Sequence, residues 1–272
     1  MIKSILVLLV ILSGLQTSLK FNEDQTPPGM VAVDKTLYID KTEVRNIEYR
    51  IHIHWIKRYK GENSKEYLNA LPDTSQKIRI LFQGNNQIQE MDLDYYFNHP
   101  NFNNYPVVSI SYEQAIEYCK WRTDMINEGI YRQKNKSLKD EKIPDNIPII
   151  YKLRLPTKSE WIKVANQGID LKYKKKLENE GIKYEIIEQV LVTGNFLENG
   201  ENMPVNVDFG NVNNTRCYNI YGNVAEMSNN KGIAFGGSYC EKLSDFKIDK
   251  EYHYDLPKVW IGFRCVAEKI EN

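Results

Sequence analysis

Leu153-Arg-Leu-Pro-Thr-Lys-Ser-Glu-Trp161 is the stretch that decides the fold of this 272-residue chain. Its Thr157 and Glu160 have the spacing of a capping box, in which the hydroxyl accepts a free backbone N–H and the carboxylate reaches back to another. Trp161, Val164 and Ala165 then follow at helical spacing. The stretch therefore predicts a helix that begins at Thr157.

A second capping box, Ser111-Tyr-Glu-Gln114, precedes Ala115, Ile116 and Cys119 and predicts another helix. Towards the N-terminus, Met30–Val33 and Leu37–Ile39 flank a polar pair and predict two short strands. Residues 47–59 carry apolar side chains on one helical face and predict a helix.

Five segments that include these elements occur in a fixed order along the chain. They are Leu37-Tyr-Ile-Asp-Lys-Thr-Glu-Val-Arg-Asn46; Tyr105-Pro-Val-Val-Ser-Ile-Ser111 with Ala115-Ile-Glu-Tyr-Cys-Lys-Trp121; Leu153–Trp161; Tyr218-Asn-Ile-Tyr-Gly-Asn-Val-Ala-Glu226; and Gly236-Gly-Ser-Tyr239 with Ile261-Gly-Phe-Arg264. Together they resemble the formylglycine-generating enzyme, or sulfatase-modifying-factor, family. The resemblance implies an α+β, C-type-lectin-like fold with little regular secondary structure, a small twisted sheet and a few helices.

The resemblance covers residues 29–270, which we expect to form one domain. Within it, residues 123–147 and 171–190 are rich in charged residues, and we expect both segments to be insertions on a compact core. Residues 21–28 read as a polar linker, and residues 1–20 as a signal peptide.

The signal-peptide prediction rests on Lys3 followed by the apolar run Ile5–Leu15. That run is too short for a comfortable membrane span, although an uncleaved anchor is the alternative. No cysteine precedes Cys119, which argues against a lipid anchor. We therefore expect export to the periplasm or cell surface, with no membrane span after signal removal.

The family resemblance also implies a calcium site. Calcium prefers six to eight oxygen ligands, and the matching positions here are Asn219, Gly222, Val224 and Glu226. The alternative is an ordinary Asn-Gly turn with a surface glutamate. The calcium would be structural, because it would tie together loops that have little core of their own.

The family's oxidases use two nearby cysteines beyond the Gly-Gly-Ser-Tyr segment to bind copper, and soft thiolates suit copper(I). Here the aligned positions fall near Phe246 and Glu251, and Cys240 has no partner at the required spacing. The sequence therefore offers no catalytic residue of the family's kind and does not favour copper. Whether the chain is an enzyme stays open.

Four cysteines in an exported chain favour two disulfides, and three pairings are open. The resemblance implies a bridge between Cys119 and Cys265. That leaves Cys217 and Cys240 as a second pair, with two unpaired thiols as the alternative.

The 36 basic and 36 acidic residues balance, so no overall basic field exists to recruit nucleic acid. His52 and His54 lie two residues apart, so on a helix their side chains would diverge. We expect a non-catalytic binding or scaffold protein of the cell envelope with a protein or peptide partner. The N-terminal portion, including Pro27-Pro-Gly29, is similar to exported Bacteroidetes members, some of them gliding-motility or secretion-machinery lipoproteins. The alternative is a formylglycine-generating oxidase that acts on sulfatase cysteines.

Overall fold

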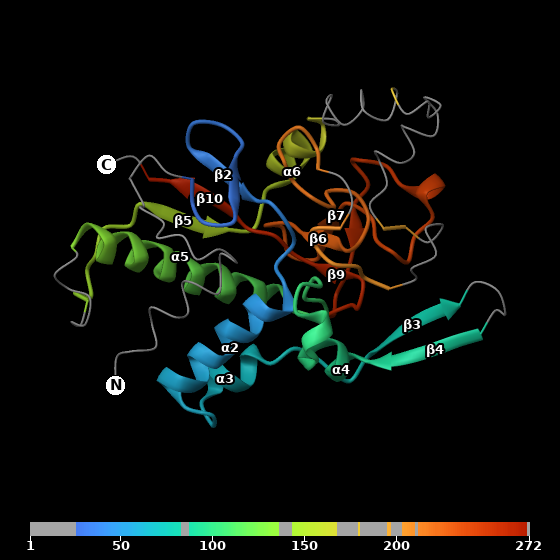
Figure 1. The fold of residues 1–272 in the computed structure, drawn as a ribbon, viewed down its shortest axis with the longest axis horizontal. Helices are drawn as coiled ribbons and strands as arrows, with labels where there is room; N and C mark the ends of the chain where they lie inside the picture. The colour runs from blue at the N-terminus through green and yellow to red at the C-terminus, as the bar shows by residue number, and fades with distance from the viewer. Residues whose placement is uncertain are drawn as a thin grey trace.

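The computed structural model describes residues 26–82, 87–135, 143–167, 179, 195–196, 203–209 and 212–270. Predictions about the signal peptide and about the charged segment 171–190 fall almost entirely outside these residues. The described part combines a few helices with two four-stranded sheets and a separate hairpin (Figure 1). The predicted α+β fold class, with few helices and small sheets, is confirmed.

One sheet joins the two ends of the domain. Its order is β1 (Met30–Ala32), β2 (Leu37–Asp40), β10 (Val266–Lys269) and β5 (Tyr151–Arg154), all antiparallel. Both predicted N-terminal strands therefore form. Because β10 lies between β2 and β5, the last strand of the domain holds two earlier segments together (Figure 1).

The second sheet carries the C-terminal loops. Its order is β8 (Tyr252–His253), β7 (Ile233–Phe235), β6 (Ala225–Met227) and β9 (Ile261–Gly262), with β6 and β9 parallel. The hairpin of β3 (Lys77–Phe82) and β4 (Gln87–Asp92) projects from the body of the domain (Figure 1). The strands of the second sheet have only two or three residues, so they depend on side-chain contacts as well as on their backbone hydrogen bonds.

Five α-helices surround the sheets in the described part of the chain. They are α2 (Asn46–Lys60), α3 (Lys65–Ala70), α4 (Leu93–Asn98), α5 (Tyr112–Lys134) and α6 (Lys158–Ala165), with short 3₁₀ turns at Pro100–Phe102 and Leu243–Asp245. Helix α5 lies along β5 (Figure 1).

Both predicted capping boxes are confirmed. The Gln114 N–H donates to Ser111 Oγ over 3.1 Å, and the Ser111 N–H donates to Gln114 Oε1 over 2.7 Å. At α6, Thr157 and Glu160 make the equivalent pair of bonds. Glu160 also accepts two bonds from Arg154, at 2.7 and 2.8 Å, so this carboxylate joins β5 to the start of α6.

The structure differs from the sequence prediction at residues 123–134. We expected them to belong to a charged insertion, but they continue α5. Ile126 and Ile130 are buried in the main core, while Arg132 pairs with Glu128 one turn away. The charged residues are the solvent side of an amphipathic helix, and the buried isoleucines extend the core beneath it.

His52 lies in that core, between α2 and α5. Its ring contacts Tyr118 at 5.6 Å and Trp121 at 4.9 Å between ring centroids. Neither imidazole nitrogen has a hydrogen-bond partner among the described residues. Burial lowers the pKa of His52 to about 4, because the charged imidazolium would lose its hydration without gaining a partner.

We predict that His52 makes the fold sensitive to mild acid. In the unfolded chain its pKa returns to about 6.5, so the unfolded state binds more protons between pH 6.5 and 4. The contribution of His52 to stability is therefore complete above pH 6.5 and falls as the pH drops towards 4, by about 2 kcal/mol at pH 5. Other titrating groups are common to the wild type and the variant, so on going from pH 7.5 to 5 the free energy of urea unfolding should change by about 2 kcal/mol more unfavourably in the wild type than in His52→Phe. The exposed neighbour provides the control: His54→Gln should show the same pH dependence as the wild type, and equal pH dependence in the wild type and His52→Phe would refute the assignment.

Candidate functional site

Residues Asn219 to Glu226, the predicted calcium loop, form a tight turn that leads into β6. Asn219, Gly222 and Asn223 have φ of 47°, 74° and 58°, in the left-handed region that glycine and asparagine tolerate best. The Gly222 N–H donates to the carbonyl of Gly236 over 2.6 Å. The loop is thus fastened by its backbone to the segment after β7.

The side chain of Glu226 points into the protein and pairs with Arg264. The Arg264 Nε donates to Glu226 Oε2 over 2.7 Å and its Nη2 to Oε1 over 2.5 Å, while Trp161 Nε1 donates to Oε2 over 2.9 Å. Glu226 is 1% exposed and Arg264 is fully buried. Two-point pairing of this kind is the strongest that an arginine and a carboxylate make.

Arg264 connects further segments. Its Nη1 donates to the carbonyl of Asp40 over 3.0 Å and its Nη2 to the carbonyl of Tyr218 over 2.9 Å. One guanidinium therefore joins the end of β2, the start of the 219–226 loop and strand β6. Sequence reasoning treated Arg264 only as part of a motif and did not predict this role.

The fit of calcium to the loop depends on Glu226. Both of its oxygens already accept bonds from Arg264 or Trp161, so coordination would require it to share or release these donors. Asn219 donates through Nδ2 to the carbonyl of Val207, and its Oδ1, which accepts no bond from the described residues, could act as a ligand oxygen. No group of three or more His, Cys, Asp or Glu suited to a metal occurs among the described residues. Calcium bound by Asn219, Gly222, Val224 and Glu226 stays a prediction.

A second buried carboxyl, Glu43, was not expected from the sequence. Its Oε1 accepts a 2.7 Å bond from Asn223 Nδ2, and Asn223 Oδ1 accepts the N–H of Val205 over 2.8 Å. Glu43 Oε2 has no partner among the described residues, and burial raises the pKa of Glu43 to about 8. The one feature of the sequence that could have indicated its burial is its position between the strand at residues 37–40 and the apolar Val44.

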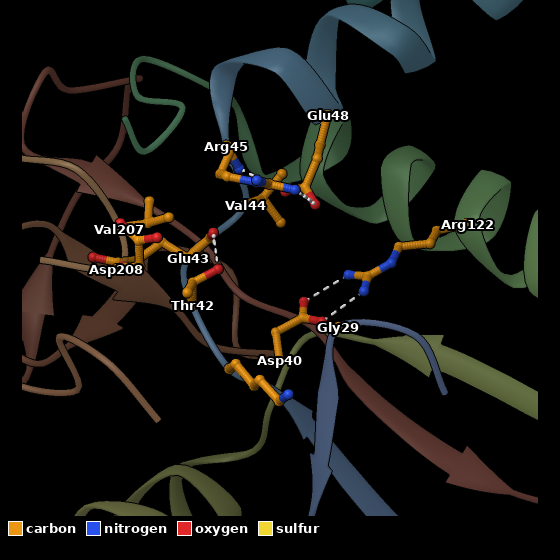
Figure 2. A pocket seen from close by; sticks show the side chains of 11 residues that line it. Gly29, Asp40, Thr42, Glu43, Val44, Arg45, Glu48, Arg122, Val207 and Asp208 are labelled. Carbon is orange, nitrogen blue, oxygen red and sulfur yellow. Dashed lines mark hydrogen bonds and ion pairs between the residues drawn. The ribbon is translucent and has the colours of Figure 1, made fainter. Parts of the chain in front are cut away.

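A small cavity of about 160 Å³ opens beside this segment (Figure 2). Asp40 and Arg122 face each other across one side, joined by bonds of 2.6 and 2.7 Å, and Arg45 pairs with Glu48 on another. Asp40 also accepts the Cys265 N–H over 2.8 Å. Two of the ion pairs that line the cavity are complete, whereas Glu43, which also belongs to the lining, has one unpaired carboxyl oxygen.

The cysteines expected to form the first bridge lie side by side. The sulfurs of Cys119, on α5, and Cys265, just before β10, are 3.4 Å apart and buried. All four cysteines are free thiols in this structure. Cys217 is buried 3.7 Å from the carbonyl of Asp40, whereas Cys240 is exposed. Both disulfides stay predictions.

The segment beyond Tyr239 is filled by other side chains where the resemblance led us to look for a thiol pair. The ring of Phe246 packs against Phe196 and Tyr221 at 5.5 and 5.2 Å between centroids. Glu251 pairs with Lys158 at 2.5 Å. Close by, Glu241 accepts bonds from Lys250 and Tyr252. These contacts make a packed surface, not an open thiolate site.

Gly237 shows how closely this surface is packed. Its φ is 74°, and a Cβ there would lie 2.9 Å from the ring of Phe196 and 3.1 Å from both Glu241 Oε2 and the ring of Phe246. Such contacts are too short for any larger residue without displacement of its neighbours, so glycine is required at this position.

His52 and His54 diverge as expected on α2, since His52 is buried and His54 is exposed. No described helix is long and apolar enough to cross a membrane.

Comparisons with known proteins identify the family of this chain. The chain resembles solved structures of CarF (18% identity, TM-score 0.48, 86% of this chain and 87% of that one), PvdO from Pseudomonas aeruginosa (15%, 0.49, 94% and 89%) and Treponema denticola variable protein 1 (15%, 0.45, 90% and 92%). No curated protein matches. A family model described as the sulfatase-modifying factor enzyme 1-like domain matches residues 6–269. The chain therefore belongs to the sulfatase-modifying factor enzyme 1-like domain family.

Proposed function

We propose that this protein is an exported, non-catalytic member of its family that acts as a binding or scaffold protein in the periplasm or at the cell surface. The observation that carries the proposal is the placement of the four cysteines. Cys119 and Cys265 are buried against each other, Cys217 is buried alone and Cys240 is exposed alone. Phe246 and Glu251 stand near the positions where the family's oxidases carry their copper-binding cysteines.

A copper(I) oxidase site of the family's kind uses soft thiolate ligands, and the substrate cysteine must be able to reach them. The adjacent pair, Cys119 and Cys265, lies in the main core and so cannot meet a substrate cysteine. Burial also raises the pKa of the Cys265 thiol, with Cys119 beside it adding to the shift, and this disfavours the thiolate. These facts support a binding role over the alternative, a formylglycine-generating oxidase acting on sulfatase cysteines.

Export is supported by the sequence of residues 1–20 and by the position of Cys119 and Cys265, whose sulfurs need only about 1.4 Å of closure to reach a disulfide length of about 2.0 Å. Similarity of the N-terminal portion to gliding-motility and secretion-machinery lipoproteins supports a partner in such an assembly. That partner would be a protein or peptide of the cell envelope.

We predict that the protein purified from the cell envelope without reductant contains a Cys119–Cys265 bridge and binds no copper. Peptide mass mapping should detect the bridge, and after reduction an equimolar copper(I) titration should show no site that resists competition by a thiol buffer. Cys240→Ser is the matched variant and should behave as the wild type. Tight copper binding lost in Cys240→Ser, with oxygen consumption in the presence of a cysteine peptide, would establish the oxidase instead.

We also propose structural calcium at the loop formed by Asn219 to Glu226, where the amide oxygen of Asn219 and the backbone carbonyls of Gly222 and Val224 would join Glu226. Replacing calcium by a chelator should lower the melting temperature of the wild type by several degrees, because an ion that binds only the folded state stabilises it. Asn219→Ala should remove this calcium response.

Asn219→Asp, which adds a charged oxygen ligand, should enlarge the calcium response. Glu226→Ala is less informative on its own, since it leaves Arg264 buried and unpaired whether or not calcium binds. An unchanged calcium response in Asn219→Ala, or none in the wild type, would exclude the site.

A further inference from the structure

A cavity of about 440 Å³ is lined in part by strand β1. Its walls come from the strand itself, from the residue that follows β2 and from the turn at residues 214–216. The lining residues are Thr26, Met30, Val31, Ala32, Lys41, Asn214, Thr215 and Arg216. This volume falls within the range of small-ligand sites, and none of the observations above uses it.

Strand β1, which contributes to the lining, also has free backbone groups at its outer edge. The strand is the last of its sheet among the described residues. On either side of β1, Lys41 donates its N–H to the carbonyl of Gly29, and Val33 donates its N–H to the carbonyl of Leu37. The odd-numbered residues 29 to 33 therefore bond towards β2. In an antiparallel ladder the residues between them face the other way.

Met30 and Ala32 therefore direct their backbone groups away from β2. The Met30 N–H is taken by the carbonyl of Pro27 over 3.1 Å. The Met30 carbonyl and both backbone groups of Ala32 have no partner among the described residues. An edge of this kind is a template for one more strand.

The charge on the cavity is positive. Lys41 and Arg216 are exposed, have no ion-pair partner in the described part of the chain, and meet no acidic residue in the lining. Arg216 holds φ at 66°, with its N–H bonded to the carbonyl of Asn213 over 2.7 Å, so its position is fixed by the turn. The shielded Thr215 hydroxyl also lacks a partner there. An anionic group bound in the cavity would be attracted by both cations.

We propose that this cavity binds an extended peptide that adds a strand to β1 and places a carboxylate between Lys41 and Arg216. The free edge of β1 could bind a peptide backbone, and the cations Lys41 and Arg216 could bind its carboxylate. An inorganic anion would use only the two cations. Strand addition of this type takes its affinity from main-chain hydrogen bonds and its specificity from side-chain pockets. The inference deepens the proposed binding function by naming the class of partner.

The test uses a fluorescein-labelled hexapeptide of alternating valine and glutamate with an amidated C-terminus, titrated by fluorescence anisotropy against the full chain. We expect saturable binding, weakened at least tenfold in the double variant K41Q/R216Q and for the valine–glutamine peptide. The variant R58Q/K60Q, which removes two exposed charges from α2, should bind like the wild type. A valine–glutamine peptide with a free C-terminus identifies whether a terminal carboxylate can replace the side-chain one.

Ala32→Pro separates strand addition from simple anion binding. Proline removes the outward N–H without disturbing the ladder to β2, since edge positions tolerate it. We expect at least a tenfold loss in this variant. Retained affinity in Ala32→Pro, equal affinity in K41Q/R216Q, or no saturable binding by the wild type would each overturn the proposal.

Glu23 and Asp24 precede Thr26 in the sequence, outside the described residues. Peptide affinity should be unchanged in E23Q/D24N; a tenfold increase would assign the cavity to the chain's own acidic residues and overturn the proposal. The copper and disulfide measurements do not involve this edge. If the peptide-binding proposal fails, the proposed non-catalytic function is therefore not contradicted.

Discussion

The buried ion pair of Glu226 and Arg264 is the interaction on which the rest of this structure depends. The second sheet has strands of only two or three residues, too short to hold a fold through their ladders alone. Arg264 binds the carboxylate of β6, the end of β2 and the start of the 219–226 loop at once, and Trp161 brings α6 to the same carboxylate. Two sheets and one helix therefore meet at this ion pair.

A second buried pair, Asp40 and Arg122, extends the network to α5. Asp40 also accepts the Cys265 N–H, so the two pairs flank the same turn before β10. Buried pairs add little net stability compared with apolar packing, because both ions lose their hydration. Their effect is on specificity: once either partner is removed, the other is left as an uncompensated buried charge, which costs about 3–5 kcal/mol. These pairs fix which segments meet.

This internal balance of charge bears on function. The carboxylate of Glu226 is satisfied by protein groups, and the segment beyond Tyr239 is closed by Phe246 and by the bonds of Glu241. Among the described residues, unpaired groups occur in the core, as at His52 and Glu43, and also on the surface, at the free edge of β1 and at Lys41 and Arg216. The surface groups are the ones that the proposed binding function would use.

Much of the fold could be predicted from the sequence, and the site could be predicted only in part. The capping boxes at Ser111 and Thr157 and strands β1 and β2 follow from local rules of spacing and polarity, and the family follows from ordered motifs. The continuation of α5 through residue 134 was missed because charged residues outnumber the isoleucines that face the core.

The buried contacts were missed for a different reason. Asp40 and Arg122 are 82 positions apart, and Glu43 and Asn223 are 180 apart, so nothing local marks them as partners. Only the folded topology brings each pair together. The resemblance implied Glu226 as a calcium ligand, and nothing local in the sequence indicated that Arg264 also lies against it.

The most direct test of this account is a double-mutant cycle on Glu226 and Arg264, with the free energy of unfolding measured for Glu226→Gln, Arg264→Gln and the double variant. Each single change should cost about 3–5 kcal/mol, because it leaves one buried charge unpaired. The double change should cost less than their sum by at least about 2 kcal/mol, as expected for residues in direct contact. Costs that add to within about 0.5 kcal/mol would show that the two residues do not act as a pair, and would contradict the account.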